Sequence, residues 1–498
     1  MEIVATFVPT ARRDPLEELG HPPVGATSVE LRADMLDESH DLAALVAASP
    51  LPVVVTLRSR AEGGDGPDDA AARGRFFAKA AALPAAVFDL EAARDRQLVD
   101  SVIPRDRAIL SAHFPGSAPA DVLERAATML DAGTRFVKIV PTAATLSDVV
   151  AVLRLAQALN ARSRPAPRAV VFAAGEAGRA TRLLGPLLGA PLAYAAWDAT
   201  RRAAPGQYLP DEVLALVGHL SSRPKRLFAV LGVRVGGSLS PRVHAAAYRA
   251  ISLPNAFVPL EVAEPAELDA LLRPLGESCL DDLGLTAGGF AVTMPWKREA
   301  AARCTVLAPR ARRAEAANTV LPRQGKVLGD CTDIDGITRV LAEEGVDLPG
   351  SRALVLGAGG AARAAVVALE LAGARVAVAA RDVARGREMA ARLGAVVTDV
   401  EASERAAVVV NATPAGADGT PDAWLERLQL PRGGVVVDLP YGVGPTFLEQ
   451  LSGARGWRFV GGREVLLFQA VSQFAAMTGA APPVQAMAQA LGLGDGEE

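Results

Sequence analysis

Lys138 is the residue whose surroundings most directly suggest chemistry in this chain. It lies in Thr134–Val140, a short apolar run that we interpret as a buried strand. Alternation along a strand places Phe136, Lys138 and Val140 on one face. A lone ammonium is costly to bury, and loss of its proton would leave a nucleophilic amine that can form a Schiff base with a carbonyl. The alternative is a strand-end lysine whose head group reaches water.

Other polar side chains stand at or just after the ends of neighbouring apolar runs. In a barrel of parallel strands these ends meet at one rim, where catalytic groups lie. A histidine there can act as a general base, and guanidinium forks suit a planar carboxylate. The residues at these positions are Glu30, Arg32, Arg58, Glu62, Glu91, His113, Arg182 and Gln207.

A glycine-rich turn in the second half predicts a dinucleotide site. The apolar run 352–356 leads directly into Gly357, Ala358, Gly359, Gly360 and Ala361, which open an Ala-rich helix. Such a turn presents backbone amides and a helix N-terminus to a pyrophosphate.

The end of the next apolar run predicts which dinucleotide binds. Arg381 follows residues 375–380, and Arg385 comes one turn later. Arginines at this place favour the extra phosphate of NADP, whereas an acidic residue favours NAD. Asp382 is adjacent, so the choice stays open at this point.

The elements that must position these residues alternate between apolar runs and Ala/Leu-rich amphipathic stretches. About eight such units in the first 220 residues predict a parallel sheet closed into a (β/α)8 barrel. A polar, proline-containing break at 221–225 predicts a domain boundary. A helical tail is expected over 464–491, with a break at Pro482 and Pro483. The last residues, 494–498, should be loose. The expected strands are 3–8, 28–31, 53–57, 86–90, 108–111, 135–140, 169–173 and 192–195.

Composition narrows the classes of function. The chain has 498 residues and a net charge of −4, and no basic tract stands out, so we expect neither nucleic-acid nor membrane-surface binding. No apolar run is long enough to cross a membrane, and because residues 1–8 read as a strand we expect no signal peptide. Three scattered cysteines fit a reducing cytoplasm and show no zinc spacing, so no metal is predicted.

Residues 1–220 resemble type I 3-dehydroquinate dehydratase. The likeness rests on Glu-x-Arg, Thr-x-Arg with Glu-Gly-Gly, Ser-x-His, Val-Lys-Ile, Gly-x-x-Gly-x-x-Thr-Arg and Ala-Pro-Gly-Gln, taken in order. Two departures are Phe114, where the family usually has Asp, and Ala203, where it usually has Ser. The resemblance implies a Schiff base on Lys138, proton transfer by His113, orientation by Glu62 or Glu91, carboxylate clamps at Arg58 and Arg182, and further substrate contacts from Glu30, Arg32 and Gln207.

Residues 227–490 resemble shikimate dehydrogenase. The likeness rests on Ser-Leu-Ser-Pro-x-x-His, Val-Thr-Met-Pro-Trp-Lys, Ala-Asn-Thr, Thr-Asp, Asn-Ala-Thr-Pro, Asp-Leu-Pro-Tyr and a glutamine near the C-terminus. It departs from the family at Gly237, Ala245, Ala291, Cys331 and Ala380. The resemblance implies Lys297 and Asp333 as the proton-handling pair, substrate contacts from Ser238, Ser240, Thr293, Asn318 and Gln469, and NADP contacts from the glycine turn, Arg381, Arg385, Asn411, Thr413, Tyr441 and Gly462.

Together the two resemblances predict a bifunctional α/β enzyme, because the product of the first reaction is the substrate of the second. Residues 1–222 would dehydrate 3-dehydroquinate to 3-dehydroshikimate. Residues 227–335 with 462–492 would form a substrate domain and 336–461 a Rossmann domain, and these would reduce 3-dehydroshikimate to shikimate with NADPH. The expected location is the cytoplasm, and a homodimer through the barrel is compatible with the resemblance.

Three alternatives stay open. The reductase half could prefer quinate or NAD. The chain could be a non-catalytic quinate-sensing regulator, although the expected lysines, His113 and Asp333 are present and no basic DNA-binding element is visible. A third possibility is a class I aldolase barrel fused to an unrelated reductase. The serine loop (Ser-Leu-Ser-Pro-x-x-His, from Ser238) and the two clamp arginines, Arg58 and Arg182, argue against it.

Overall fold

The structure is a computed structural model that describes residues 1–10, 13–37, 39–84, 86–116, 118–163, 166–221 and 223–494. Ser222 of the predicted boundary and the tail 495–498 lie outside the described residues. Contacts divide the chain into two compact units: Met1–Lys225 with Val258–Ala263 and Asp282–Gly284, and the remainder of the chain.

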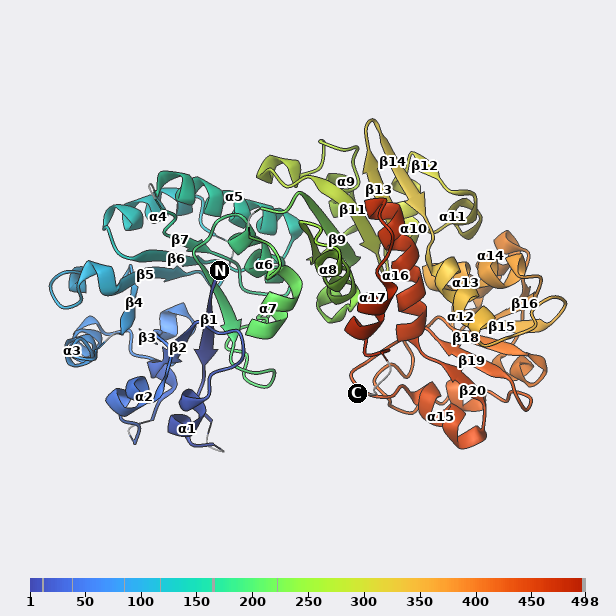
Figure 1. The fold of residues 1–498 in the computed structure, drawn as a ribbon, viewed down its shortest axis with the longest axis horizontal. Helices are drawn as coiled ribbons and strands as arrows, with labels where there is room; N and C mark the ends of the chain where they lie inside the picture. The colour runs from blue at the N-terminus through green and yellow to red at the C-terminus, as the bar shows by residue number, and fades with distance from the viewer. Residues whose placement is uncertain are drawn as a thin grey trace. The chain divides into compact units, whose positions relative to one another are not determined.

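The first unit is an eight-stranded parallel sheet curved into a barrel, with helices on its outside (Figure 1). Neighbouring strands pair in the order β7-β6-β5-β4-β3-β2-β1-β8, which confirms the predicted (β/α)8 fold. The strand β5 runs two residues past its predicted end at Ser111, so His113 belongs to the strand itself. The strands are β1 (Glu2–Phe7), β2 (Ser28–Arg32), β3 (Val53–Thr56), β4 (Val87–Glu91), β5 (Ala108–His113), β6 (Phe136–Val140), β7 (Ala169–Val171) and β8 (Leu192–Ala196).

The barrel's α-helices are amphipathic segments that cover the outer faces of these strands. Several begin at side-chain caps, such as Asp69 before α3 and Thr145 before α5, because the first amides of a helix lack partners within it. They are α1 (Pro15–Gly20), α2 (Leu42–Ala48), α3 (Ala70–Ala80), α4 (Val122–Asp131), α5 (Leu146–Arg162), α6 (Arg179–Leu187) and α7 (Pro210–Val217).

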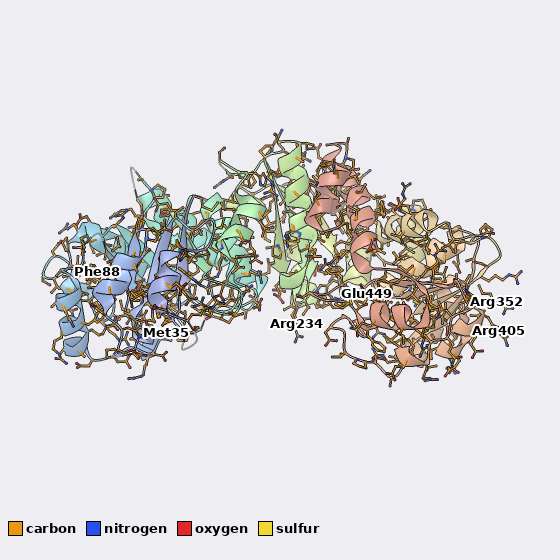
Figure 2. The ribbon with its side chains drawn as sticks, turned by 60° about the horizontal axis from the view of Figure 1, so that its bottom comes forward. Met35, Phe88, Arg234, Arg352, Arg405 and Glu449 are labelled. Carbon is orange, nitrogen blue, oxygen red and sulfur yellow. The ribbon has the colours of Figure 1, made fainter. Side chains whose placement is uncertain are left out.

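Strand β4 shows how alternation builds a polar interior. Phe88, labelled in Figure 2, points outward and packs edge-on against Phe77 of α3, with ring centroids 6.4 Å apart. Asp89 and Glu91 therefore point inward, and they are 1% and 0% exposed. Buried carboxylates need cations beside them, and the barrel supplies these from other elements.

Arg73 of α3 fixes the end of this strand from outside. It is fully buried, and its Nε and Nη2 donate to Asp95 at 2.8 and 2.6 Å. Asp95 in turn accepts the backbone N–H of Glu91 at 2.8 Å. The helix, the loop after β4 and the strand end are thus held by one paired arginine.

A mixed six-stranded sheet with order β10-β9-β11-β13-β14-β12 lies in the second unit, except that Val258–Glu261 of its edge strand β10 are grouped with the first unit. The helix α16 packs against α8, α12, β11 and β13, so the C-terminal segment returns to this sheet as expected. The elements are β9 (Arg226–Gly232), α8 (Ser240–Ala250), β10 (Asn255–Glu261), α9 (Leu268–Leu271), β11 (Ala287–Val292), α10 (Lys297–Arg303), β12 (Val306–Leu307), α11 (Pro309–Ala314), β13 (Thr319–Arg323), β14 (Lys326–Asp330), α12 (Asp333–Glu343), α16 (Gly462–Thr478) and α17 (Val484–Ala490).

A second sheet of this unit is fully parallel, with order β17-β16-β15-β18-β19-β20. This doubly wound order reverses direction between β15 and β18, and ligands bind at such a point beyond the carboxyl ends of the strands. The elements are β15 (Arg352–Leu356), α13 (Gly360–Leu371), β16 (Arg375–Ala379), α14 (Val383–Leu393), β17 (Val396–Val397), β18 (Val408–Asn411), β19 (Val435–Asp438), α15 (Phe447–Arg455) and β20 (Arg458–Val460).

We expect Arg73→Met to destabilise the barrel by about 3–5 kcal/mol, because it leaves the carboxylate of Asp95 buried and unpaired. Urea unfolding of the barrel transition measures this change. Arg125→Met is the matched control, since Arg125 pairs with Asp121 on the surface and such pairs contribute less than about 1 kcal/mol. Equal decreases in the free energy of unfolding for Arg73→Met and Arg125→Met would contradict this account of the buried pair.

Candidate active sites

The inner rim of the barrel encloses a cavity of about 200 Å³. Its lining brings together residues from β1, β2, β3, β5, β6 and β8 and from the loops that follow the strands. The unpredicted Thr6, Thr56 and Tyr194 also line it. So do Phe114 and Ala203, the two departures from the family pattern. The predicted site residues in the lining are Glu30, Arg32, Arg58, Glu62, His113, Lys138, Arg182 and Gln207.

Lys138 is buried, and its ammonium is paired. Its Nζ lies 2.5 Å from Asp89 Oδ2 and 3.2 Å from Glu30 Oε1, and 4.5 Å from the ring centroid of Tyr194. The expectation of a lone ammonium is therefore wrong, and so is the alternative of a head group in water, because the residue is only 2% exposed. Two carboxylates take the place of proton loss in offsetting the burial of the charge.

Each of the two carboxylates is itself held in place. Glu30 accepts hydrogen bonds from the hydroxyls of Thr6 and Thr56 at 2.8 and 2.9 Å. Burial alone would raise the pKa of Glu30, but the ammonium of Lys138 and other polar partners bring it below its usual value. Burial acts on Asp89 in the same way, and Arg58 and Lys138 outweigh it, so the pKa of Asp89 lies far below its usual range.

The two arginines predicted as carboxylate clamps differ sharply. Arg58 donates to Asp89 at 2.8 Å, to Glu91 at 3.1 Å and to Glu62 at 3.2 Å, so its guanidinium already serves protein carboxylates. Arg182 is 4% exposed, and its Nε and Nη1 find no hydrogen-bond partner among the described residues. Burial lowers the pKa of Arg182 to about 10. Arg182 is thus the clamp whose donors are available to an incoming anion.

His113 and Glu62 form a pair at the cavity wall. Glu62 Oε2 lies 3.0 Å from His113 Nδ1 and accepts the backbone N–H of the same residue at 3.0 Å. Burial and the cations Arg58 and Lys138 hold the pKa of His113 well below its usual value. Burial, opposed by Arg58, raises the pKa of Glu62 to about 7. A neutral imidazole bound through Nδ1 leaves Nε2 available as a base.

The remaining predicted residues of the barrel occupy its rim. Arg32 pairs with Asp34 through Nε and Nη2 at 2.9 and 2.6 Å, and Gln207 accepts the backbone N–H of Ala204 at 3.2 Å. Glu91 bonds Arg58 and the amide of Ser59 at 2.8 Å. Of the two glutamates predicted to orient His113, Glu62 is the one that contacts it.

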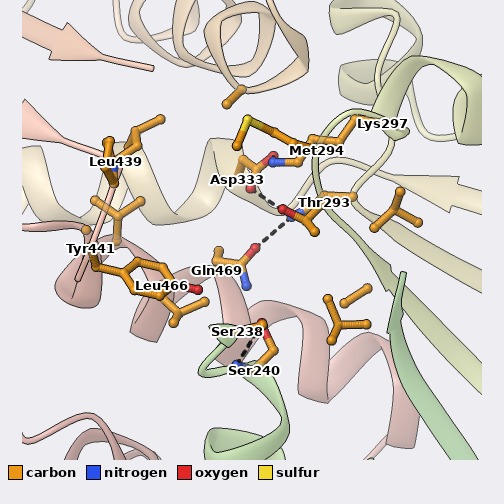
Figure 3. A pocket seen from close by; sticks show the side chains of 18 of the residues that line it. Ser238, Ser240, Thr293, Met294, Lys297, Asp333, Leu439, Tyr441, Leu466 and Gln469 are labelled. Carbon is orange, nitrogen blue, oxygen red and sulfur yellow. Dashed lines mark hydrogen bonds and ion pairs between the residues drawn. The ribbon is translucent and has the colours of Figure 1, made fainter. Parts of the chain in front are cut away.

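The second unit holds a cavity of about 380 Å³, where the ends of the two sheets meet. Figure 3 shows the carboxamide of Gln469 between the pair formed by Lys297 and Asp333 and the two serines, Ser238 and Ser240, at the start of α8. Ala291, a departure from the family pattern, also lines the cavity. The predicted residues in the lining are Ser238, Ser240, Thr293, Lys297, Asn318, Asp333, Ala361, Thr413, Tyr441, Gly462 and Gln469.

Lys297 and Asp333 stand at the N-terminal ends of α10 and α12 and make an ion pair. Lys297 Nζ donates to Asp333 Oδ2 at 2.6 Å. Their side chains are 11% and 14% exposed, so the pair is accessible from the cavity. An ammonium that faces a cavity and is held by a carboxylate can give or take a proton there.

Asn318 connects this pair to the rest of the site. Its Nδ2 donates to Asp333 Oδ1 at 3.0 Å and to Gln469 Oε1 at 2.7 Å, while its Oδ1 accepts the amide of Thr332 at 2.7 Å. Gln473 donates to the backbone carbonyl of Asn318 at 3.1 Å. Asn318 therefore fixes the position of Asp333 and the orientation of the Gln469 amide.

The glycine turn has the shape that a pyrophosphate requires. Gly357 has φ +112°, a conformation that favours glycine, and an added Cβ at Gly359 would meet nothing within 4 Å. An added Cβ at Gly360 would lie 2.7 Å from Lys297 Cβ. The turn thus leaves open space at the start of α13 and brings α13 close to the helix that carries Lys297.

Two exposed arginines follow β16, in the place predicted for them. Asp382 uses its carboxylate to cap α14, accepting the amide of Arg385 at 3.1 Å. Arg381 lies 3.6 Å from Asp422 and faces the ring of Trp424. Asn411 is fully buried and bonds Asp438 at 2.8 Å, so its side chain shapes the strand ends and lies outside the cavity lining.

Two functional residues escaped the sequence analysis. Asp89 is a carboxylate within an apolar strand, two residues before Glu91, and that spacing was a usable signal for an inward-facing pair. Gln473 follows Gln469 by one helical turn, so the two amides share a helix face. Neither position shows its partners in the sequence, because those partners lie on other strands and helices.

Comparison with known families gives matches to both halves of the chain. Residues 4–222 match the family described as Type I 3-dehydroquinase, and residues 230–320 match the shikimate dehydrogenase substrate binding domain. A shikimate dehydrogenase (NADP(+)) of Halobacterium salinarum is 35% identical over 53% of this chain and 98% of its own length. The chain belongs to the shikimate dehydrogenase family. Ahead of the part that matches this family it carries the type I 3-dehydroquinase barrel.

A relative that spans both halves also exists. The bifunctional 3-dehydroquinate dehydratase/shikimate dehydrogenase of Arabidopsis thaliana chloroplasts is 28% identical over 92% of this chain and 79% of that protein. Among solved structures, the shikimate 5-dehydrogenase of Thermus thermophilus in complex with NADP(H) and shikimate is 32% identical over 53% of this chain and 98% of that one, with a TM-score of 0.47. No helix among the described residues of this shikimate dehydrogenase family member is long and apolar enough to span a bilayer.

Glu62 gives the barrel a predictable pH dependence of stability. Its folded-state pKa of about 7 exceeds the usual 4.5, so the folded state holds a proton that the unfolded state releases first. Its contribution to the free energy of unfolding is present below about pH 4.5 and is lost as pH rises to 7. Glu62→Gln should remove this loss, which we expect to be about 1–3 kcal/mol.

Urea unfolding of the barrel at pH 5 and pH 8 measures the difference. Glu124→Gln, a change on the exposed first turn of α4, is the control. Stability curves of wild type and Glu62→Gln that run parallel between these pH values would contradict the raised pKa.

Proposed function

We propose that this protein dehydrates 3-dehydroquinate to 3-dehydroshikimate in the barrel and reduces 3-dehydroshikimate to shikimate in the second unit with NADPH. The observation that carries the proposal is the presence of a cavity in each unit, each lined by a lysine that is paired with a carboxylate. The names of the matched families and of the relative that spans both halves support the same pair of reactions.

The barrel has the groups that Schiff-base dehydration needs. Lys138 Nζ lines the cavity, and once its ammonium has passed one proton to a neighbouring carboxylate it can attack a ketone. Loss of water then gives a protonated imine that draws electrons from the adjacent carbon. His113 Nε2 can then take the proton of that carbon and later return it to the leaving hydroxyl. The available donors of Arg182 suit the carboxylate of the substrate, which would orient the ring between the lysine and the histidine.

The second unit has the groups that ketone reduction needs. NADPH would supply the hydride, and the glycine turn with Thr413, Gly462 and Arg381 would hold it. Charge builds on the ketone oxygen during reduction, and Lys297 Nζ can donate its proton there while Asp333 holds the amine in place. Ser238, Ser240 and Gln469 line the same cavity and would bind the substrate carboxylate and hydroxyls.

The open alternatives become weaker in the light of these contacts. One oxygen of Asp382 caps α14, and the arginines beside it favour NADP over NAD. A quinate-sensing regulator would not need two complete proton-transfer pairs. An unrelated reductase would not carry the serine loop, Asn318 and Gln469 around one cavity.

Some further assignments go with this proposal. We propose a substrate domain over 227–335 with 462–492 and a nucleotide domain over 336–461, which agree with the two sheets of the second unit. The cytoplasmic location and a homodimer through the barrel stay predictions.

The two activities should be separable by single substitutions. Lys138→Ala removes the amine that would form the imine in the barrel cavity, so we expect dehydration to fall by roughly 10³-fold or more while reduction of 3-dehydroshikimate stays within about twofold. Lys297→Ala should lower reduction by about 10²- to 10⁴-fold and spare dehydration. Dehydration is followed by product absorbance and reduction by NADPH consumption.

Lys79→Ala and Lys326→Ala are matched controls, because both lysines are exposed on the surface of their units. Neither should change either rate. If Lys138→Ala or Lys297→Ala lowered both activities equally, the account of two independent sites would be wrong.

A further inference from the structure

Asp89 is the carboxylate nearest to the nucleophilic nitrogen of the barrel among the residues that the structure describes. Its Oδ2 lies 2.5 Å from Lys138 Nζ, and both side chains are almost fully buried. We propose that Asp89 is a catalytic residue that acts as the counter-ion of the imine nitrogen and keeps it protonated during removal of the α-proton. This inference rests on the proposed dehydratase function.

The balance of the reaction explains why one carboxylate can serve throughout. The ammonium of Lys138 and the ketone give a protonated imine and one water, with a C–N bond formed and the C–O bond broken. The nitrogen therefore carries one positive charge before and after this step. A carboxylate that pairs with the ammonium is already in place for the iminium that replaces it.

The next steps move this charge and then restore it. His113 takes the α-proton, the C–H electron pair forms a C=C bond, and the imine electron pair moves onto nitrogen. The protonated His113 then gives its proton to the leaving hydroxyl, which departs as water, and the nitrogen electron pair regenerates a conjugated iminium. A second water hydrolyses this iminium to the product ketone and the ammonium. Only a protonated imine can accept electrons in the first of these steps.

The groups around the imine nitrogen show why its protonated form needs electrostatic stabilisation. Burial favours the neutral imine, since taking a charge out of water is costly. Arg58 and His113 stand close to Asp89 and add positive charge nearby when protonated. An opposite charge within about 4–6 Å raises the pKa of such a cation by about 1–3 units. The charged and titratable groups facing the nitrogen and Asp89 are Glu30, Arg32, Arg58, Glu62, His113 and Tyr194.

The two carboxylate oxygens of Asp89 have different partners. Oδ1 accepts Arg58 Nη2 at 2.8 Å and the hydroxyl of Ser111 at 2.5 Å, which fixes the carboxylate in the barrel wall. Oδ2 is thereby turned toward Lys138. Glu30 is the second carboxylate at the nitrogen, but it is farther away at 3.2 Å and also accepts two threonine hydroxyls. Asp89 is therefore the stronger electrostatic partner.

The test compares the alkaline limb of the pH profile for dehydration between the wild-type protein and Asp89→Asn. Asp89→Asn keeps the size of the side chain and removes its charge, so the imine should lose its proton at lower pH. We expect the alkaline limb of kcat to move down by at least about one unit and kcat at pH 7.5 to fall at least about tenfold. Borohydride reduction during turnover, followed by mass analysis, should still trap an adduct on Lys138, which shows that the barrel is folded and the imine forms.

Glu91→Gln is the matched control. Glu91 binds Arg58 as Asp89 does, at 3.1 Å, but does not contact Lys138. Its substitution should leave the alkaline limb in place even if it lowers the rate. An unmoved limb in Asp89→Asn, a shift equal to that of Glu91→Gln, or complete loss of the trapped adduct in a folded protein would each overturn the assignment.

A second variant, Glu30→Gln, tests the proposal even if Asp89→Asn does not fold. If Asp89 is the main counter-ion, the alkaline limb of Glu30→Gln should stay within about half a unit of wild type. A shift of about a unit or more in Glu30→Gln would assign the role to Glu30 and overturn the proposal. Failure of the wild-type protein to dehydrate 3-dehydroquinate would instead refute the proposed function, and the two failures are thus distinguishable.

Discussion

The buried ion pair between Lys138 and Asp89 is the interaction around which the polar interior of the barrel is arranged. A charged lysine inside a barrel is stable only beside a carboxylate, and that carboxylate must itself be held in place. Arg58 binds Asp89 and Glu91, and Arg73 binds Asp95 behind them. The network runs from the reactive nitrogen to the outer helix α3, so helix packing and the position of the nucleophile are coupled.

The second unit positions its lysine by different means. Lys297 pairs with one carboxylate at the edge of a cavity, and neutral amides do most of the positioning. Asn318 reaches both Asp333 and Gln469, and Gln473 ties Asn318 to α16. Because α16 comes from the end of the chain and β13 from its middle, this site exists only once the C-terminal helix has packed against the mixed sheet. A buried imine-forming amine needs charge compensation, whereas a proton donor at a cavity edge needs mainly orientation.

The sequence was sufficient for elements whose signals are local. Strand alternation, the glycine turn after residues 352–356 and the proline break in the tail all predicted what the structure contains. It was insufficient for the partners of Lys138, since Glu30 precedes the lysine by 108 residues and Asp89 lies on another strand, and only the register of the barrel brings them together. The interpretation of Lys138 as a lone amine failed for this reason. Likewise the sequence left Asp382 open as a ribose partner, and the structure shows that one of its carboxylate oxygens caps α14.

The most direct test of the account is to identify the nitrogen that becomes covalently linked to substrate. The wild-type protein would be reduced with borohydride while it converts 3-dehydroquinate, digested, and its peptides weighed. The account predicts one adduct, on the peptide that contains Lys138, and unmodified peptides for Lys79, Lys225, Lys297 and Lys326. An unmodified Lys138 in an enzyme that dehydrates its substrate, or an adduct on another lysine, would contradict it.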